Sequence, residues 1–269
     1  KLLPWRTHMK FSLLSHIHMH AKCQKQFGGN SIKVNTFKLN KLSLSGIVAN
    51  LEETVRRLTW KAKGTEWATY YENTNYTDEA FSDKKQIVAD YLDYIKPKEV
   101  WDIGANQGVF SQIASEKGIN VISFDMDPVA IEKCYLKCSN DKIVNILPLY
   151  TDLSNPSSNI GWANEERMSM IERGPTEMVF ALALIHHLAI SNNVSFLKIA
   201  DFLNKICKTL IIEFVPKFDS QVQGLLRNRE DCFLEYSQEN FEDSFKKYFQ
   251  IIRSTSIRNS RRTIYLLRN

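Results

Sequence analysis

The stretch Val-Trp-Asp-Ile-Gly-Ala-Asn-Gln-Gly at residues 100–108 constrains the fold of this chain more than any other segment. An apolar run enters a loop that holds an acid and two glycines, which predicts a buried strand, a tight turn and a helix. Gly104 can adopt backbone angles closed to residues with a Cβ, and Gly108 can let the helix begin close to the strand. Asn106 stands where a third glycine is expected, and asparagine tolerates a left-handed conformation. The pattern therefore predicts a loop that binds a nucleotide-type cofactor.

The dinucleotide fingerprint G-x-G-x-x-G is the main alternative, but the segment lacks the middle glycine that lets backbone approach a pyrophosphate. Asp102 lies two residues before Gly104. A fixed negative charge there repels phosphate and favours a cationic or amine-bearing ligand. With this loop the chain resembles the class I S-adenosylmethionine-dependent methyltransferases, whose first motif is an acid-x-Gly-x-Gly-x-Gly loop that holds the methionine end of the cofactor. The resemblance implies that S-adenosyl-L-methionine is bound by Asp102, Gly104, Ala105, Asn106 and Gly108, and Asn106 departs from the family's motif.

A second apolar run, residues 120–126, contains Asp125, which lies 17 residues after Gly108. In a βαβ unit this spacing places a carboxylate at the carboxyl end of the second strand, where it can accept both hydrogen bonds of a ribose diol. Asp127 precedes a proline and is interpreted as the N-cap of a helix over 128–138. Asp125 is therefore the predicted ribose ligand, and the neighbouring Met126 is assigned to the same site.

Asp152 follows a third apolar run, residues 143–150. The resemblance places this acid beside the adenine amino group, and the alternative is a turn residue before Ser154-Asn155-Pro156. Tyr76 and Lys84 are assigned to the cofactor site because the resemblance implies that their region closes over the cofactor. Ala183, which is among the residues that carry the resemblance, is assigned to the same site.

The rest of the chain continues an alternation of strands and helices, and its near-continuous apolar strands are typical of a parallel sheet covered on both faces. Strands are predicted at 177–184 and 208–215, helices at 77–95, 194–207 and 237–249, and a hairpin at 250–257 and 262–267. The long connection 151–175 is predicted to contain a helix over 162–172. With the resemblance, this order predicts an α/β fold over residues 77–269: a Rossmann-like three-layer sandwich around a mixed seven-stranded sheet whose last strand is antiparallel.

Within the class I family the chain resembles a bacterial group related to host-specific nodulation proteins. This resemblance implies a methyltransferase and leaves the methyl acceptor unidentified. It is carried by the loop at Asp102 and by residues 64–67, 74–76, 183–188 and 212–216.

His186, His187 and Glu213 are predicted to serve the transfer step, because they follow or end the fourth and fifth predicted strands. The carboxyl ends of parallel strands open onto one crevice, and an acid at an apolar strand end is costly without a role. Methyl transfer needs an aligned nucleophile and, for some acceptors, removal of a proton. The structural alternatives are that His187 caps a turn and that Glu213 pairs with a cation such as Lys217.

The charge of the chain is asymmetric, because residues 1–63 hold 12 Lys+Arg and 2 acids, whereas residues 64–269 hold 23 and 28. This predicts a basic, largely helical N-terminal arm that, with a site-covering loop, extends over residues 1–76 and contacts an anionic partner. The alternative is that the arm packs on a missing acidic domain, because the chain begins at Lys1 and is expected to be part of a longer protein. An apolar stripe within residues 45–58 predicts an amphipathic helix: Ile47, Val48, Leu51, Val55 and Leu58.

Composition favours a cytoplasmic enzyme. No apolar run approaches the roughly 20 residues that span a bilayer, there is no signal-peptide pattern, and five cysteines without CxxC pairs suit a reducing compartment. His16, His20 and Cys23 share a helix face without a local acidic partner, so no metal site is predicted. Two other function classes remain open: a methyltransferase-like scaffold that binds cofactor without turnover, and an NAD-dependent Rossmann oxidoreductase, which the missing middle glycine disfavours.

Overall fold

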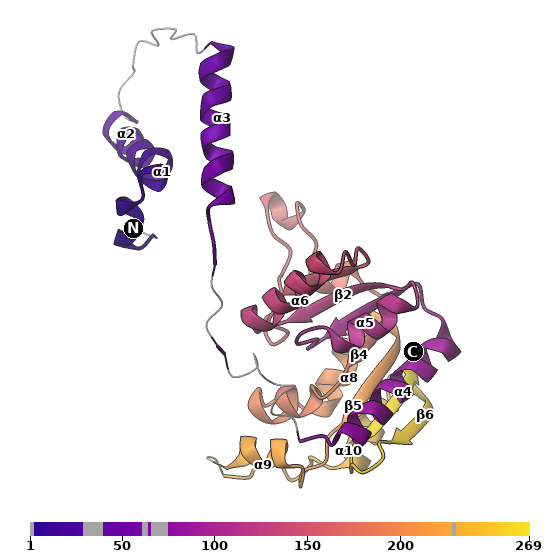
Figure 1. Cartoon of the computed structure of the whole chain (residues 1–269). Helices are drawn as coiled ribbons and strands as arrows, with labels where there is room; N and C mark the ends of the chain where they lie inside the picture. The colour runs from indigo at the N-terminus through magenta and orange to yellow at the C-terminus, as the bar shows by residue number, and fades with distance from the viewer. Residues whose placement is uncertain (1–2, 29–39, 61–63, 66–74, 228–229) are drawn as a thin grey trace. The chain divides into compact units, whose positions relative to one another are not determined.

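A mixed sheet of seven strands forms the centre of the larger of two units into which the chain divides, Lys1–Lys61 and Ala62–Asn269 (Figure 1). The computed structural model describes residues 3–28, 40–60, 64–65, 75–227 and 230–269. The strands are β1 (Glu99–Ile103), β2 (Asn120–Asp125), β3 (Ile146–Tyr150), β4 (Thr176–Ala181), β5 (Cys207–Phe214), β6 (Gln250–Ser256) and β7 (Thr263–Arg268). Their order is β3-β2-β1-β4-β5-β7-β6; the first five are parallel, and β7 runs antiparallel to both neighbours. The predicted fold class is confirmed.

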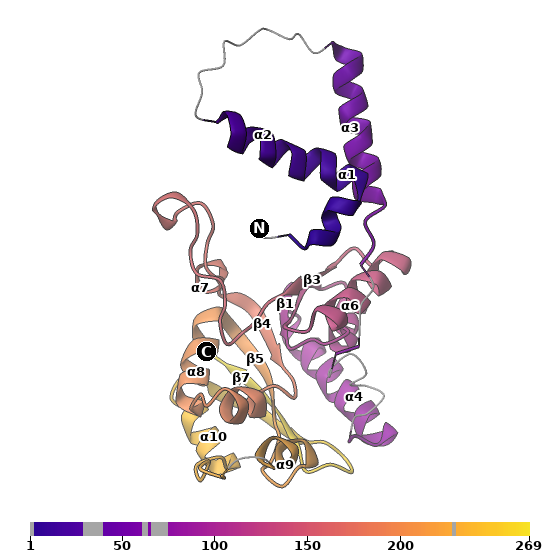
Figure 2. The ribbon, with the colours of Figure 1, turned by 90° about the vertical axis from the view of Figure 1, so that its left-hand side faces the viewer.

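Helices cover both faces of the sheet because side chains alternate along its buried strands. In β1, for example, Val100 belongs to one apolar core and Trp101 to the other. One face carries α4 (Asp78–Ile95), α5 (Val109–Glu116) and α6 (Pro128–Asn140). The other carries α7 (Met170–Arg173), η4 (His187–Ser191), α8 (Phe196–Ile206), α9 (Ser220–Leu226) and α10 (Gln238–Phe245). The two helical layers can be followed in Figure 2.

The order of the strands in the sheet changes direction between β1 and β4. From β1 the chain proceeds outward to β2 and β3, and then returns to pair β4 with the other side of β1. In open α/β sheets, ligands bind outside the carboxyl ends of the strands at such a switch point. The loop after β1 and the loop after β4 therefore flank the expected site.

Local signals explain where the helices near this point begin. The carboxylate of Asp127 accepts hydrogen bonds from the amides of Val129 (2.8 Å) and Ala130 (3.4 Å), so the prediction that it caps α6 is confirmed. Thr77 caps α4 by accepting from the amide of Ala80.

The predicted helix over 162–172 is wrong. This segment contains a short 3-10 turn, η3 (Trp162–Asn164), and a bridge between Ile160 and Arg167 before α7 begins. Three consecutive or near-consecutive positions have positive φ, namely Gly161, Ala163 and Asn164, which interrupts any helix. Ser169 and Glu172 then form a capping box, so the helix begins at Met170. The helix α9 was not predicted.

The described residues of the smaller unit are mostly helical. It comprises η1 (Trp5–Met9), α1 (Phe11–Leu13), η2 (Leu14–Met19), α2 (His20–Phe27) and α3 (Lys41–Arg56). Asn40 caps α3 by accepting from the amide of Ser43, and the predicted apolar stripe is exposed. No helix in the described ranges is long and apolar enough to cross a membrane.

Gly108 should tolerate no side chain, because its φ is +76° and an added Cβ would lie 2.7 Å from Sγ of Cys134 on α6. We expect Gly108→Ala to lower the free energy of unfolding by about 1–3 kcal/mol more than Gly118→Ala, measured by urea denaturation. Gly118 is the matched control, because its φ is also +76° and nothing lies within 4 Å of its Cβ position. Equal losses would show that close packing at Gly108 contributes nothing.

Candidate functional site

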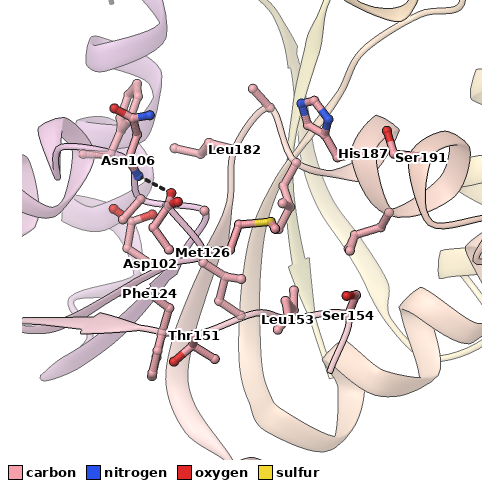
Figure 3. A pocket seen from close by; sticks show the side chains of 18 of the residues that line it. Asp102, Asn106, Phe124, Met126, Thr151, Leu153, Ser154, Leu182, His187 and Ser191 are labelled. Carbon is pink, nitrogen blue, oxygen red and sulfur yellow. Dashed lines mark hydrogen bonds between the residues drawn. The ribbon is translucent and has the colours of Figure 1, made fainter. Parts of the chain in front are cut away.

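A cavity of ≈ 410 Å³ opens at the carboxyl ends of β1, β2 and β4 (Figure 3). Its volume is in the range of small-molecule sites, and its walls are largely apolar. Most of the side chains predicted for the site line it: Tyr76, Lys84, Asp102, Gly104, Ala105, Asn106, Asp125, Met126, Asp152, Ala183 and His187. Gly108, His186 and Glu213 do not. In Figure 3, Asp102 and Asn106 lie on one side of the cavity and His187 and Ser191 on the other.

The loop after β1 turns by repeated use of the left-handed region. Gly104, Asn106 and Gly108 have φ values of +75°, +51° and +76°, so asparagine does take the conformation expected of it. The amides of Gly104 and Ala105 both donate to the carbonyl of Phe124, at 2.8 and 3.0 Å. These bonds fix the loop against the end of β2, and the loop backbone consequently forms a wall of the cavity.

Asp125 is held by two backbone donors at the end of β2. Its Oδ2 accepts from the amide of Asn106 (2.7 Å) and its Oδ1 accepts from the amide of Asp127 (2.8 Å). Partial burial raises the pKa of this carboxyl, and the two amide bonds oppose the rise. A carboxylate has about four lone-pair sites, so each oxygen retains capacity to accept a further bond from a ligand.

Asp102 lies in the cavity wall and has almost no contact with solvent, since its relative exposure is 2%. Its Oδ2 accepts from the hydroxyl of Ser111 (2.6 Å), which also contacts the hydroxyl of Ser123 (2.7 Å). The pKa of Asp102 is raised to about 6. Burial is the main cause, the hydrogen bond from Ser111 opposes the rise, and the charge of Asp125 adds to it. A cation bound beside Asp102 would stabilise its charged form.

Asp152 is a turn residue that also lines the cavity. Its Oδ1 accepts from the amide (2.9 Å) and hydroxyl (2.6 Å) of Ser154, as in a side-chain turn, and the residue also lines the cavity. Its orientation is therefore set by the turn.

Glu213 lies behind the cavity wall, where its carboxylate is completely buried between two cations. Its Oε2 is 2.7 Å from Nζ of Lys84, and its Oε1 is 3.4 Å from Nη1 of Arg262. The hydroxyl of Tyr76 donates to Oε1 and accepts from Nη1 of Arg262 at 2.7 Å. Burial opposes the charge of Glu213, but Lys84 and Arg262 hold the pKa of this carboxyl below its usual value.

The partners of Glu213 differ from the suggested Lys217, whose ammonium pairs instead with Asp231 at 2.7 Å. Arg262 extends the network to Asp219, with Nε 2.8 Å from Oδ2 and Nη2 3.0 Å from Oδ1. We call the five side chains of Tyr76, Lys84, Glu213, Asp219 and Arg262 the buried ion network. Tyr76 and Lys84 are its members that line the cavity.

His187 lines the cavity, whereas His186 is buried beside it with ring centroids 4.1 Å apart. Burial and, to a smaller extent, the charge of Arg262 together lower the pKa of His187 to about 4. The pKa of His186 is lowered well below the usual value, chiefly by burial and then by His187. Both rings are therefore neutral at pH 7. Among the described residues, Nδ1 of His186 has no hydrogen-bond partner.

Several residues of the cavity were not predicted from the sequence. Phe81, Phe110, Leu153, Leu188 and Leu225 are apolar wall residues, which have the same sequence signature as core residues. Arg262 was predicted only as the start of a strand, because its partners lie far away in the sequence. Of the predicted covering loop 64–76, residues 66–74 lie outside the described residues.

In sequence, the chain is similar to nodulation protein NoeA of Rhizobium meliloti (strain 1021), with 35% identity over 272 residues, 98% of this chain and 57% of NoeA. The chain thus spans just over half the length of this relative. No protein-family model matches it.

Solved structures with this fold share little sequence with the chain. PH0226 protein of Pyrococcus horikoshii OT3 matches with a TM-score of 0.52 and 14% identity, over 76% of this chain and 99% of that one. The methyltransferase domain of bacterial CtHen1-C matches with 0.51 and 16%, over 70% and 98%. Magnesium protoporphyrin IX methyltransferase from Synechocystis PCC 6803, solved with bound SAH, matches with 0.50 and 15%, over 76% and 93%. These likenesses establish the fold.

Removing the charge of Glu213 should destabilise the protein strongly, because the buried Lys84 would lose its anion and the buried Arg262 would keep only Asp219. We expect Glu213→Gln to lower the free energy of unfolding, measured by urea denaturation, by about 3–5 kcal/mol. Asp201→Asn is the matched control: it breaks the exposed pair of Asp201 with Lys205 (2.6 Å) and should change stability by less than about 1 kcal/mol. A Glu213→Gln variant as stable as this control would contradict the role given to the network.

Proposed function

The chain is a relative of nodulation protein NoeA with the fold of the class I methyltransferases, and from this premise we propose that it binds S-adenosyl-L-methionine in the cavity and transfers the methyl group to an acceptor. The observation that carries the proposal is the pair of acids at neighbouring strand ends, Asp102 in the buried wall and Asp125 held by two amides. The two acids match two polar groups of this cofactor, the ammonium of its methionine part and the diol of its ribose.

Asp102 supports binding of the amino-acid end. A carboxyl with a pKa near 6 and almost no solvent contact gains from a neighbouring ammonium, and a phosphate there would meet a repulsive charge. The backbone of Gly104 and Ala105 lines the same part of the cavity. A methionine ammonium fits this environment better than the pyrophosphate of NAD.

Asp125 supports binding of the ribose. Its two oxygens are fixed by the amides of Asn106 and Asp127, so the carboxylate is oriented before any ligand arrives. Both hydroxyls of a ribose diol can donate to it. Met126 and Asp152 lie beyond Asp125 on the cavity wall and are proposed to contact the adenine.

When bound, the cofactor supplies a methyl group on a sulfonium, which an acceptor nucleophile displaces in line. The residues of the chain then have to bind, orient and exclude water. His187 lies across the cavity from Asp102 and Asn106 and is neutral at pH 7, so we assign it to the acceptor side, where it accepts a hydrogen bond from the incoming group. Because a pKa near 4 makes a weak base, its main contribution is alignment.

His186 and Glu213 are proposed to act through their neighbours, since neither lines the cavity. His186 packs against the ring of His187, and Glu213 fixes Tyr76 and Lys84 in the cavity wall. They are positioning residues in this proposal.

Calorimetry with S-adenosylhomocysteine, the demethylated product, tests the cofactor directly. We expect it to bind more tightly than NAD, and Asp125→Asn to lose about tenfold or more in affinity, because charged hydrogen bonds to the ribose are replaced. Asp201→Asn, remote from the cavity, should bind as the unmodified chain does. Tighter binding of NAD, or an Asp125→Asn variant with full affinity, would refute the proposal.

Acidification should have opposite effects on binding and on stability. Protonation of Asp102 removes the partner of the ligand's ammonium, so affinity for S-adenosylhomocysteine should fall about tenfold from pH 7 to pH 5. In the ligand-free protein the folded-state pKa of Asp102 lies above its unfolded value, so this group's contribution to stability increases as pH falls from about 6 to 4. Titrations at several pH values with Asp102→Asn as control check this, since that variant should bind weakly and lose both dependences. Binding that is constant between pH 5 and 7 would contradict the role of Asp102.

A further inference from the structure

A second cavity, of ≈ 380 Å³, lies at the same edge of the sheet as the first. Three segments form it: the loop after β5, the turn between β6 and β7, and the residues just before α4. Tyr76 lines both cavities. The residues around the second cavity are Asn75, Tyr76, Phe218, Asp219, Asn259, Ser260, Arg261 and Arg262.

The polar side chains at the floor of this cavity already hydrogen-bond to one another. Arg262 directs Nε and Nη2 to Asp219, Nη1 to Tyr76, and Nη2 also to Oδ1 of Asn75 at 2.9 Å. The amide group of Asn75 in turn donates to Asp219 and to the hydroxyl of Ser220, both at 2.9 Å. Arg262 and Asp219 therefore neutralise one another and form a rigid base.

Arg261 differs from its neighbour in the contacts of its guanidinium. Its guanidinium lies over the ring of Phe218, with 4.9 Å from Cζ to the ring centroid, and in the described part of the chain it makes no ion pair. Stacking on an aromatic ring orients the planar fork of N–H donors that matches a carboxylate or phosphate. Nearby, the hydroxyl oxygen of Ser260 accepts from the amide of Arg262 at 3.3 Å, which leaves the hydroxyl proton for a ligand.

We propose that the second cavity is a subsite for an anionic group, a carboxylate or a phosphate, carried by the methyl acceptor. Arg261 binds this group through its guanidinium, Ser260 and Asn259 donate to it, and the acceptor passes Tyr76 to reach the first cavity. The assignment to the acceptor rests on the proposed methyltransferase function; the anion site itself rests on Arg261 and its surroundings.

The test uses the full 269-residue chain at low salt, with inorganic phosphate and succinate as separate probes followed by amide chemical shifts. We expect saturable shifts at residues 259–262 with at least one probe, and Arg261→Gln to weaken that binding at least tenfold. Arg258→Gln is the matched control, because it removes the same charge from the same turn without lining the cavity. It should change the affinity less than twofold.

The two probes distinguish the sources of the anion, since tighter phosphate binding indicates a phosphorylated acceptor and tighter succinate binding a carboxylated one. Absence of binding, shifts elsewhere, or equal losses in Arg261→Gln and Arg258→Gln would overturn the subsite. Calorimetry with S-adenosylhomocysteine on the same samples separates the two proposals. A chain that binds the anion here without this cofactor product retains the anion site and loses the methyltransferase assignment, whereas the reverse result overturns the subsite alone.

Discussion

The contact of Glu213 with Lys84 and Arg262 is the interaction on which the rest of the site depends. The three side chains come from β5, α4 and the residue just before β7, and all are 3% exposed or less. A charge in such a place is costly unless it is paired and hydrogen-bonded, so each member requires the others. By fixing Tyr76 and Lys84, Glu213 also shapes the wall between the two cavities. The acid that ends β5 thus organises the site without lining it.

Asp102 in the first cavity, unlike Glu213, has no ion-pair partner in the described part of the chain that offsets the cost of burying its charge in the ligand-free protein. It accepts a hydrogen bond from the hydroxyl of Ser111, and its pKa rises to about 6, chiefly because of burial. Such a group makes the ligand-free fold less stable at neutral pH than a neutral residue would. Asp125 is held by two amides and is less buried. A ligand with an ammonium beside Asp102 recovers this cost, which is the physical basis of the selectivity proposed for the cavity.

Much of the fold follows from local sequence signals. The buried runs at β1, β2 and β5 and the cap at Asp127 are determined by neighbours in the sequence, and the left-handed angle of Asn106 follows from the same rules. The ion network could not be predicted, because Arg262 meets Tyr76 across 186 positions and Glu213 across 49. The helix predicted over 162–172 failed because Ala163 adopts a positive φ, which alanine does not signal in a sequence. Local chemistry predicted the loop that lines the first cavity, and tertiary contacts decided which charged residues support it.

The most direct test of the central claim is a crystal structure of the chain with S-adenosylhomocysteine. We expect the ligand to occupy the cavity at the ends of β1, β2 and β4, with its ammonium beside Asp102 and both ribose hydroxyls donating to Asp125. His187 should then lie on the side of the sulfur that the acceptor approaches. A ligand found elsewhere, or bound in the cavity with neither acid contacting its ammonium or ribose, would contradict the account.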